Sequence, residues 1–292
     1  MAHSCDLCPR RCHAARGEDN GNGVCRMPAL PRVARAALHY GEEPCISGKN
    51  GSGTVFFSGC SLNCRFCQNR TISQGGAGKT VSVERLAEIF RELTAQGAHN
   101  INLVNPTHYA AAIRAALDLY RPPIPIVYNT GGYERIETLR AMEGYVDVYL
   151  PDLKYLDSAL AASLSGAADY PAVATDAVLE MARQTGPVQL DAQGLAVRGT
   201  IVRHLVLPGH TRESMAALGW LKAHLPAGSY ISVLLQYTPV GELTAPLDRT
   251  LTARECRKIR DFVGELDITD GYIQQRGSAG TEFIPAFDLT GV

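Results

Sequence analysis

After residue 53 the chain alternates short apolar runs with amphipathic helical patterns, and this alternation restricts its possible folds more than any other feature of the sequence. Such alternation is typical of βαβ units around a parallel sheet. Six runs of this kind predict an α/β fold, a partial (β/α)6 barrel of the TIM type, over residues 51–292. The apolar runs begin at Thr54, Ile101, Ile124, Val146, Thr200 and Tyr230.

Local signals predict the limits of several other elements. Ser82 is expected to cap a helix, and Thr252 with Glu255 has the spacing of a capping box. The pattern LDAQGLAV predicts a hairpin that turns at Gln193–Gly194. The last predicted helix carries Cys256 on its apolar face, so we expect this residue to be a buried apolar thiol.

Three cysteines follow directly after the first apolar run. Cys60, Cys64 and Cys67 form a CxxxCxxC array beyond the carboxyl end of the expected strand, where parallel α/β folds keep their ligands. Clustered thiolates are soft ligands that favour iron–sulfur clusters or zinc. A four-iron cluster normally takes four protein thiolates, so three thiolates leave one iron open to a ligand that is not protein. A zinc site or structural thiols are the alternatives for this array.

The residues around the array resemble those of radical SAM enzymes, and more closely the branch that is similar to pyruvate formate-lyase activating enzyme. The resemblance implies a [4Fe–4S] cluster on the three cysteines, with S-adenosylmethionine (SAM) bound to the open iron. It also implies an external one-electron reductant of the flavodoxin or ferredoxin type, and a 5′-deoxyadenosyl radical that abstracts hydrogen from substrate. The stretch GEEPCISG over residues 41–48 recurs in this branch. The family pattern GCxxxCxFCxN is matched at Gly59, Cys60, Cys64, Phe66, Cys67 and Asn69.

Polar residues stand at the ends of nearly all the apolar runs. A buried polar group without a partner costs about 1–3 kcal/mol, so we expect these groups to face a ligand together; each one alone could instead be a satisfied loop group or a helix cap. By resemblance, Asp152 and Lys154 match a DLK-like segment that touches SAM, and Asn105 or Thr107 replaces a motif that holds the methionine amino group. The predicted cofactor contacts are Phe66, Asn105, Thr107, Asn129, Thr130, Asp152, Lys154, Arg203 and Gln236.

Residues 1–50 differ from the rest of the chain because they are rich in cysteine and show little hydrophobic periodicity. We expect a small N-terminal extension that is folded by a second metal site, either zinc or an auxiliary iron–sulfur cluster; unligated thiols are the alternative. Cys45 has no partner spacing and is expected to be a local structural thiol. The predicted ligands of the second site are Cys5, Cys8, Cys12 and Cys25, in the pattern CxxCxxxCx12C.

Charge and hydropathy exclude several classes of partner. The 28 Lys and Arg residues balance 29 Asp and Glu residues, so we expect no nucleic-acid partner and no anionic membrane. No apolar run approaches the ~18 residues of a spanning helix, and the first residues have no signal-peptide pattern. Clustered cysteines fit metal ligation in a reducing compartment. We therefore predict a cytoplasmic protein.

Three functions are compatible with these features. The first is a radical SAM enzyme that activates a partner protein at a backbone glycine; the second is one that modifies a small molecule or a peptide side chain. The third is a non-catalytic iron–sulfur electron carrier, which has no need of an open iron. The N-terminal cysteines depart from the nearest activating enzymes. Tyr109, Tyr237 and His204 are candidates of low weight for an acid or base, and the sequence identifies neither the catalytic residue nor the substrate.

Overall fold

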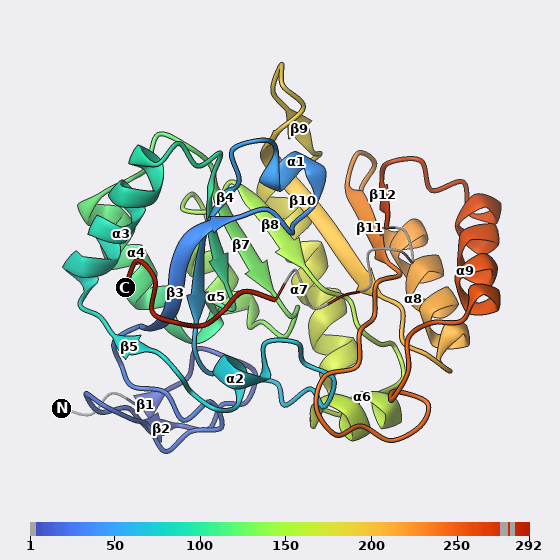
Figure 1. Cartoon of the computed structure of the whole chain (residues 1–292), viewed down its shortest axis with the longest axis horizontal. Coiled ribbons are helices and arrows are strands. Elements are labelled where there is room, and N and C mark those ends of the chain that lie inside the picture. Colours follow the sequence, from blue (N-terminus) through green and yellow to red (C-terminus); the bar gives the residue numbers. More distant parts are fainter. Residues whose placement is uncertain (1–3, 275–279, 281–283) are drawn as a thin grey trace.

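The computed structural model describes residues 4–274, 280 and 284–292, and a curved sheet of mostly parallel strands forms its centre (Figure 1). The strands are β1 (Ser4–Cys5), β2 (Ala14–Ala15), β3 (Arg32–His39), β4 (Ser52–Phe57), β5 (Lys79–Thr80), β6 (Ile101–Val104), β7 (Ile126–Thr130), β8 (Val148–Pro151), β9 (Gln189–Leu190), β10 (Ala196–Leu205), β11 (Tyr230–Leu234) and β12 (Gly271–Ile273).

The strand order of the main sheet is β12-β11-β10-β8-β7-β6-β4-β3-β5. Pairing is parallel from β4 to β12, whereas β3 is antiparallel to both β4 and β5. In the described part of the chain, β5 and β12 are unpaired edges, so the barrel is not closed. This topology confirms the predicted α/β partial barrel of the TIM type and adds β12, which the sequence analysis missed.

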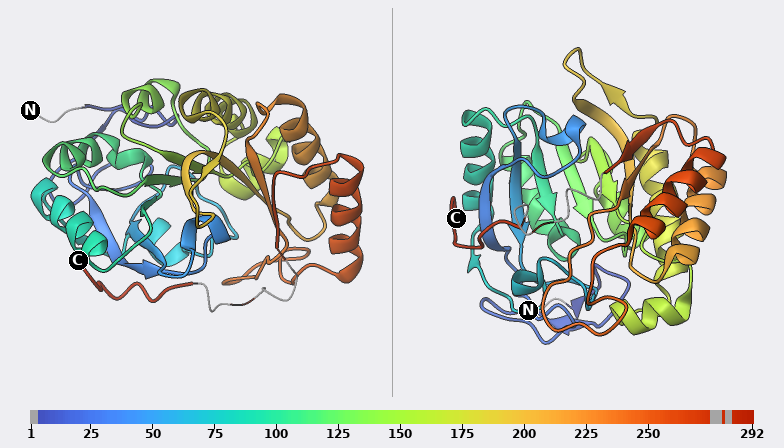
Figure 2. Two further views of the ribbon diagram at one scale, coloured as in Figure 1. Left: turned by 90° about the horizontal axis from the view of Figure 1, so that it is seen from above. Right: turned by 45° about the vertical axis from the view of Figure 1, so that its right-hand side comes forward.

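Helices form an arc around the outer face of the sheet, as the view from above shows (Figure 2). The Ser82 hydroxyl accepts from the Arg85 amide, and Thr252 with Glu255 forms the expected capping box. None of the described helices is both long and apolar enough to cross a membrane. The helices are α1 (Pro44–Ser47), α2 (Arg70–Ser73), α3 (Val83–Ala95), α4 (Ala110–Leu119), α5 (Ile136–Ala141), α6 (Ser158–Ser165), α7 (Tyr170–Thr185), α8 (Thr211–His224) and α9 (Ala253–Glu265), with a 3₁₀ turn over Thr107–Tyr109.

The predicted hairpin is confirmed, but its second strand continues into the barrel. β9 pairs antiparallel with the start of β10, and Gly194 in the turn has a φ of 78°. β10 then runs on without a break to pair with β8 and β11. The expected buried position of Cys256 is also confirmed, because its exposed fraction is 2%.

Residues 1–50, predicted as one extension, divide into two parts. β3 pairs with β4 over almost its full length and is a strand of the main sheet. Before β3, the described residues form the small antiparallel hairpin β1–β2, and few apolar side chains there are buried. The predicted boundary at residue 50 therefore does not coincide with the edge of the sheet. The metal-binding role of the extension stays a prediction.

The short helix α1 fills one end of the barrel. Cys45 and Ile46 are almost completely buried and pack against side chains of the central strands, among them Val127, Val148 and Ile201. In Figure 1, α1 lies beside the upper ends of the strands, whereas α2 and the cysteine loop lie at the lower, carboxyl ends. The segment that leads into α1 brings Glu42 and Glu43 into the interior.

Candidate active site

The cysteine loop begins at Gly59, where only glycine fits easily. Its φ is 81°, and a Cβ here would collide with the Met27 side chain and lie 3.1 Å from the Cys25 carbonyl oxygen. Asn105, which also has a positive φ of 60°, donates from Nδ2 to the Gly59 carbonyl oxygen. The N-terminal segment and the end of β6 thus fix the start of the loop together.

The three thiols of the loop are close enough to influence one another. Burial raises the pKa of Cys60, and the neighbouring Cys64 and Cys67 raise it further. Buried acidic groups that repel one another fit a metal cluster, whose positive irons would replace their protons. In the described residues, no set of three His, Cys, Asp or Glu side chains has the geometry of a bound metal ion, either in the cluster loop or among the N-terminal cysteines.

A cavity of about 240 Å³ opens beside this loop, at the carboxyl ends of the strands. It brings together two of the cysteines and six of the nine predicted cofactor contacts. Inside it the buried Gln236 Oε1 has no hydrogen-bond partner among the described residues, which fits a polar ligand. The predicted residues that line the cavity are Cys64, Phe66, Cys67, Asn129, Asp152, Lys154, Arg203 and Gln236.

Arg203 is the centre of a buried polar network at the cavity wall. Its guanidinium donates to Asp152 at 2.9 Å, to Glu42 at 3.1 Å and to Asn129 at 2.6 Å. Although burial opposes its charge, the carboxylates of Asp152 and Glu42 raise the pKa of Arg203. The guanidinium of Arg203, which the sequence predicted as a cofactor contact, is therefore occupied by two carboxylates of the protein itself.

Lys154 connects this network to the cysteines. Its Nζ is 2.5 Å from Asp152 Oδ2. Burial opposes the lysine charge, but Asp152 and the adjacent Cys64 raise the pKa of Lys154. Conversely, Lys154 and Arg203 lower the pKa of Asp152 against the effect of burial. The cavity thus holds a fixed pair of opposite charges, Lys154 and Asp152, beside the cluster loop.

Thr107 and Thr130 point to a different partner. Both hydroxyls donate to the carboxylate of Glu134, which also accepts from Tyr128 at 3.3 Å. Burial raises the pKa of Glu134 to about 7, against the lowering effect of these three bonds. Asn105 holds the Gly59 turn, as described above. The assignment of Asn105, Thr107 and Thr130 as SAM contacts stays a prediction.

Several site residues were missed by sequence reasoning. Glu42 and His39 line the cavity, and Asn102 donates to Glu42 at 3.0 Å. The pair of acids in GEEPCISG was the available signal for Glu42, but only the tertiary position of α1 brings it into the barrel. Of the low-weight acid–base candidates, Tyr237 donates to a backbone carbonyl and His204 hydrogen-bonds to another.

The N-terminal cysteines lie behind the cluster loop. Burial raises the pKa of Cys8 to about 12, and the neighbouring Cys25 and Cys5 add to the rise. Arg10 of the same segment donates to the Ser61 carbonyl oxygen at 2.7 Å, inside the cluster loop. The segment that carries the predicted second-site cysteines therefore contacts the cluster loop directly, and the metal-binding role of these cysteines stays a prediction.

Comparisons with known proteins agree with this geometry. A family model of the radical SAM superfamily matches residues 54–221, more than half of the chain. An uncharacterized protein of Methanocaldococcus jannaschii is 27% identical over 276 residues, which cover 91% of this chain and 75% of that protein. Among solved structures, Streptococcus suis SuiB matches with a TM-score of 0.51 and 13% identity over 77% of this chain and 48% of SuiB. SuiB bound to its precursor peptide SuiA matches with a TM-score of 0.48 and 15% identity, over 74% of this chain and 47% of that one.

The chain therefore spans about half the length of these solved structures. At 13% identity, the match to SuiB with a TM-score of 0.51 shows a shared fold alone. The family model covers the strand before the cysteines, the cysteine loop and the barrel as far as α8. With three cysteines beside a charged cavity in an open barrel, the match leads to one conclusion: the chain belongs to the radical SAM superfamily.

Proposed function

We propose that Cys60, Cys64 and Cys67 hold a [4Fe–4S] cluster and that SAM binds in the adjoining cavity. Membership of the superfamily implies this cluster, SAM and an external electron donor. When bound, the cluster supplies the electron that cleaves SAM to methionine and a 5′-deoxyadenosyl radical, which takes a hydrogen atom from the substrate. One observation carries the proposal: two thiols of the loop, Phe66 and the charged groups of β8 and β10 line a single cavity.

Each lining residue has a role that follows from its chemistry. Phe66 is an apolar surface on which the adenine stacks. Lys154 and Asp152 form a fixed pair of opposite charges, which suits the carboxylate and amino groups of the methionine end of SAM. Gln236 Oε1, which has no hydrogen-bond partner in the described part of the chain, can accept from a ribose hydroxyl or an amino group. The Arg203 network keeps the wall rigid while it excludes water.

The cavity favours a small polar substrate or a peptide side chain over a backbone glycine. A buried wall of ion pairs recognises polar functional groups, whereas a glycine offers only its backbone. Activation of a glycyl-radical partner, the role of the activating enzymes that the sequence resembles, is the second candidate. It is favoured by the match of the GCxxxCxFCxN pattern at residues 59–69.

We further propose that Cys5, Cys8, Cys12 and Cys25 bind a second metal centre. The described residues before β3 bury few apolar side chains, so metal ligation would supply the stability that a core normally gives. Zinc and an auxiliary iron–sulfur cluster remain alternatives. Metal analysis of a variant that lacks Cys60, Cys64 and Cys67 separates them, because only the N-terminal metal is then left.

The direct test of the proposed function is SAM cleavage. Anaerobically reconstituted protein with reduced flavodoxin or dithionite should release 5′-deoxyadenosine, and Cys64→Ala should abolish the release. Cys256→Ala is the matched control, because that thiol is buried in the α9 interface and should leave cleavage unchanged. Reconstituted protein with an intact cluster and no cleavage would refute the proposal. Deuterium transfer from candidate substrates into 5′-deoxyadenosine then identifies the hydrogen donor.

A further inference from the structure

Each thiol of the cluster loop has a hydrogen-bonding group at its sulfur, and the three groups come from different parts of the fold. One is a backbone amide inside the loop, one is a hydroxyl on α2, and one is a hydroxyl at the end of α6. The contacts are Leu62 N–H to Cys60 Sγ at 3.4 Å, Ser73 Oγ to Cys67 Sγ at 3.3 Å and Ser165 Oγ to Cys64 Sγ at 3.0 Å.

The contact of Ser165 is distinguished by a second hydroxyl behind it. Tyr155 Oη lies 3.1 Å from Ser165 Oγ. A cysteine that binds iron has lost its proton, so Ser165 must donate to the Cys64 sulfur. Because the single hydroxyl proton of Ser165 is then engaged with the Cys64 sulfur, Ser165 can only accept from Tyr155, and Tyr155 is the donor. The chemistry therefore fixes one direction of donation, from Tyr155 through Ser165 to Cys64, and such chains strengthen each member bond.

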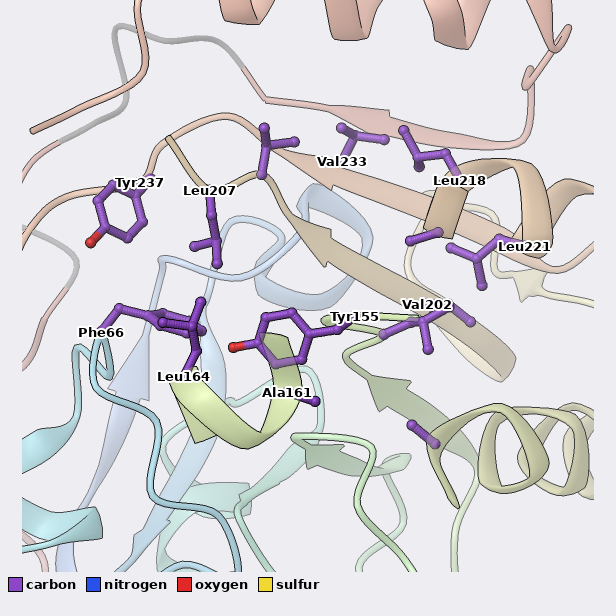
Figure 3. Close-up of a cluster of buried hydrophobic side chains, with 14 of the residues drawn as sticks. Phe66, Tyr155, Ala161, Leu164, Val202, Leu207, Leu218, Leu221, Val233 and Tyr237 are labelled. Atoms are coloured by element: carbon purple, nitrogen blue, oxygen red, sulfur yellow. The ribbon is translucent and has the colours of Figure 1, made fainter. Parts of the chain in front are cut away.

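Burial makes the hydrogen-bond series Tyr155–Ser165–Cys64 stronger than the single contact of Ser73 with Cys67. Ser165 and Tyr155 are both 0% exposed, whereas Ser73 is partly exposed. Figure 3 shows Tyr155 packed near Leu164, with its hydroxyl directed toward the side on which Phe66 lies. Water does not compete for a donor held in such surroundings, and the local dielectric constant is low.

Backbone hydrogen bonds hold the end of α6, and with it the Ser165 hydroxyl, in place beside the cysteine loop. The amide of Asn63 donates to the Ser165 carbonyl oxygen at 3.1 Å, and the amide of Arg65 donates to the Leu164 carbonyl oxygen at 2.8 Å. These two bonds flank Cys64 on either side. The end of α6 thus positions the Ser165 hydroxyl against this one sulfur.

A hydrogen bond to a cluster sulfur favours the reduced state, because reduction adds negative charge that the donor stabilises. We propose that Ser165, with Tyr155 behind it, is a positioning residue that raises the reduction potential of the cluster and so eases electron uptake from the donor. This inference rests on the proposed [4Fe–4S] cluster at Cys60, Cys64 and Cys67.

The test is a redox titration of the reconstituted protein. The electron paramagnetic resonance signal of the reduced cluster is the readout, and iron content is measured in parallel. Ser165→Ala should lower the ratio of reduced to oxidised cluster at a fixed potential about tenfold, a shift of about 59 mV to more negative values for one electron. Tyr155→Phe should shift the potential in the same direction by less. Tyr133→Phe is the matched control, because the Tyr133 hydroxyl donates to Asp169 and not to Ser165 or Cys64. This variant should leave the reduction potential unchanged.

The outcomes separate this inference from the proposed function. Wild-type protein that assembles no four-iron cluster contradicts the proposed function itself. A wild-type cluster whose potential is the same in Ser165→Ala and Tyr155→Phe, with full iron content, overturns this inference alone. If Ser165→Ala fails to assemble the cluster, Tyr155→Phe decides, because it keeps the serine and removes only the donor behind it; an unshifted potential in that variant overturns the inference.

Discussion

Replacement of Glu134 by Gln should change how stability depends on pH. The carboxyl is buried beneath Thr107 and Thr130, and burial raises its pKa from 4.5 to about 7. Glutamine has the same shape and can accept from the same hydroxyls, but it does not titrate. The variant therefore isolates the contribution of one proton.

The sign follows from the raised pKa. Below pH 4.5 the carboxyl is protonated in both the folded and the unfolded chain, and its contribution is fully present. Between pH 4.5 and 7 the unfolded chain ionises first, so the folded wild type loses stability relative to the variant. The difference between 4.5 and 7 corresponds to about 3 kcal/mol at about 1.36 kcal/mol per pH unit, of which about 2 kcal/mol falls between pH 5.5 and 7.

The assay is the melting temperature of wild type and Glu134→Gln across pH 5.5–8, at matched scan rates. At about 2 °C per kcal/mol for a chain of this size, the wild type should lose about 4 °C relative to the variant from pH 5.5 to 7, and nothing further above pH 8. Glu88→Gln, with a side chain 58% exposed, is the control and should run parallel to the wild type. Parallel curves for Glu134→Gln as well would refute the reasoning.

Three further substitutions test the site. Arg203→Met leaves Glu42 without a cationic partner and Asp152 with Lys154 alone, and should cost about 3–5 kcal/mol in unfolding free energy, read as a fall in melting temperature. The exposed Arg183→Met should cost less than about 1 kcal/mol, and equal losses would contradict the buried network. Gly59→Ala forces a side chain into a positive φ and against Met27, so iron content after reconstitution should drop well below that of wild type; full iron would show that the turn tolerates a Cβ. Phe66→Leu removes a stacking surface worth about 0.5–1.5 kcal/mol, so the Kd of SAM measured by calorimetry should rise about threefold to tenfold, and an unchanged Kd would place the adenine elsewhere.

The sequence predicted the barrel because each strand is signalled locally, by an apolar run and a capped helix. Asp152 and Lys154, predicted as cofactor contacts, both line the cavity, since alternation along an extended segment places residues two apart on one side of the chain. Thr107 and Thr130 stand at strand ends in the same way, yet they turn to Glu134. No local pattern distinguishes a hydroxyl that faces a ligand from one that donates to a buried carboxylate, which here lies four residues from Thr130 and 27 residues from Thr107.

Contacts between distant segments were beyond the reach of the sequence. Glu42 enters the site because α1 packs inside the barrel, some 160 residues from Arg203 along the chain. Ser165 reaches Cys64 because α6 follows β8 and folds back beneath the loop. A serine at a helix end is ordinary in any α/β protein, so Ser165 carries no local signal. The acid pair Glu42–Glu43 is visible in the sequence, but its place inside the barrel is not.

The placement of α1 also bears on the side from which ligands approach the cavity. Cys45 and Ile46 fill one end of the barrel, and the cavity that Glu42 and Arg203 line lies at the other end, where the cysteines stand. For the part of the chain that the structure describes, we therefore expect SAM and substrate to approach the cavity from the cysteine side and to bind in a defined order.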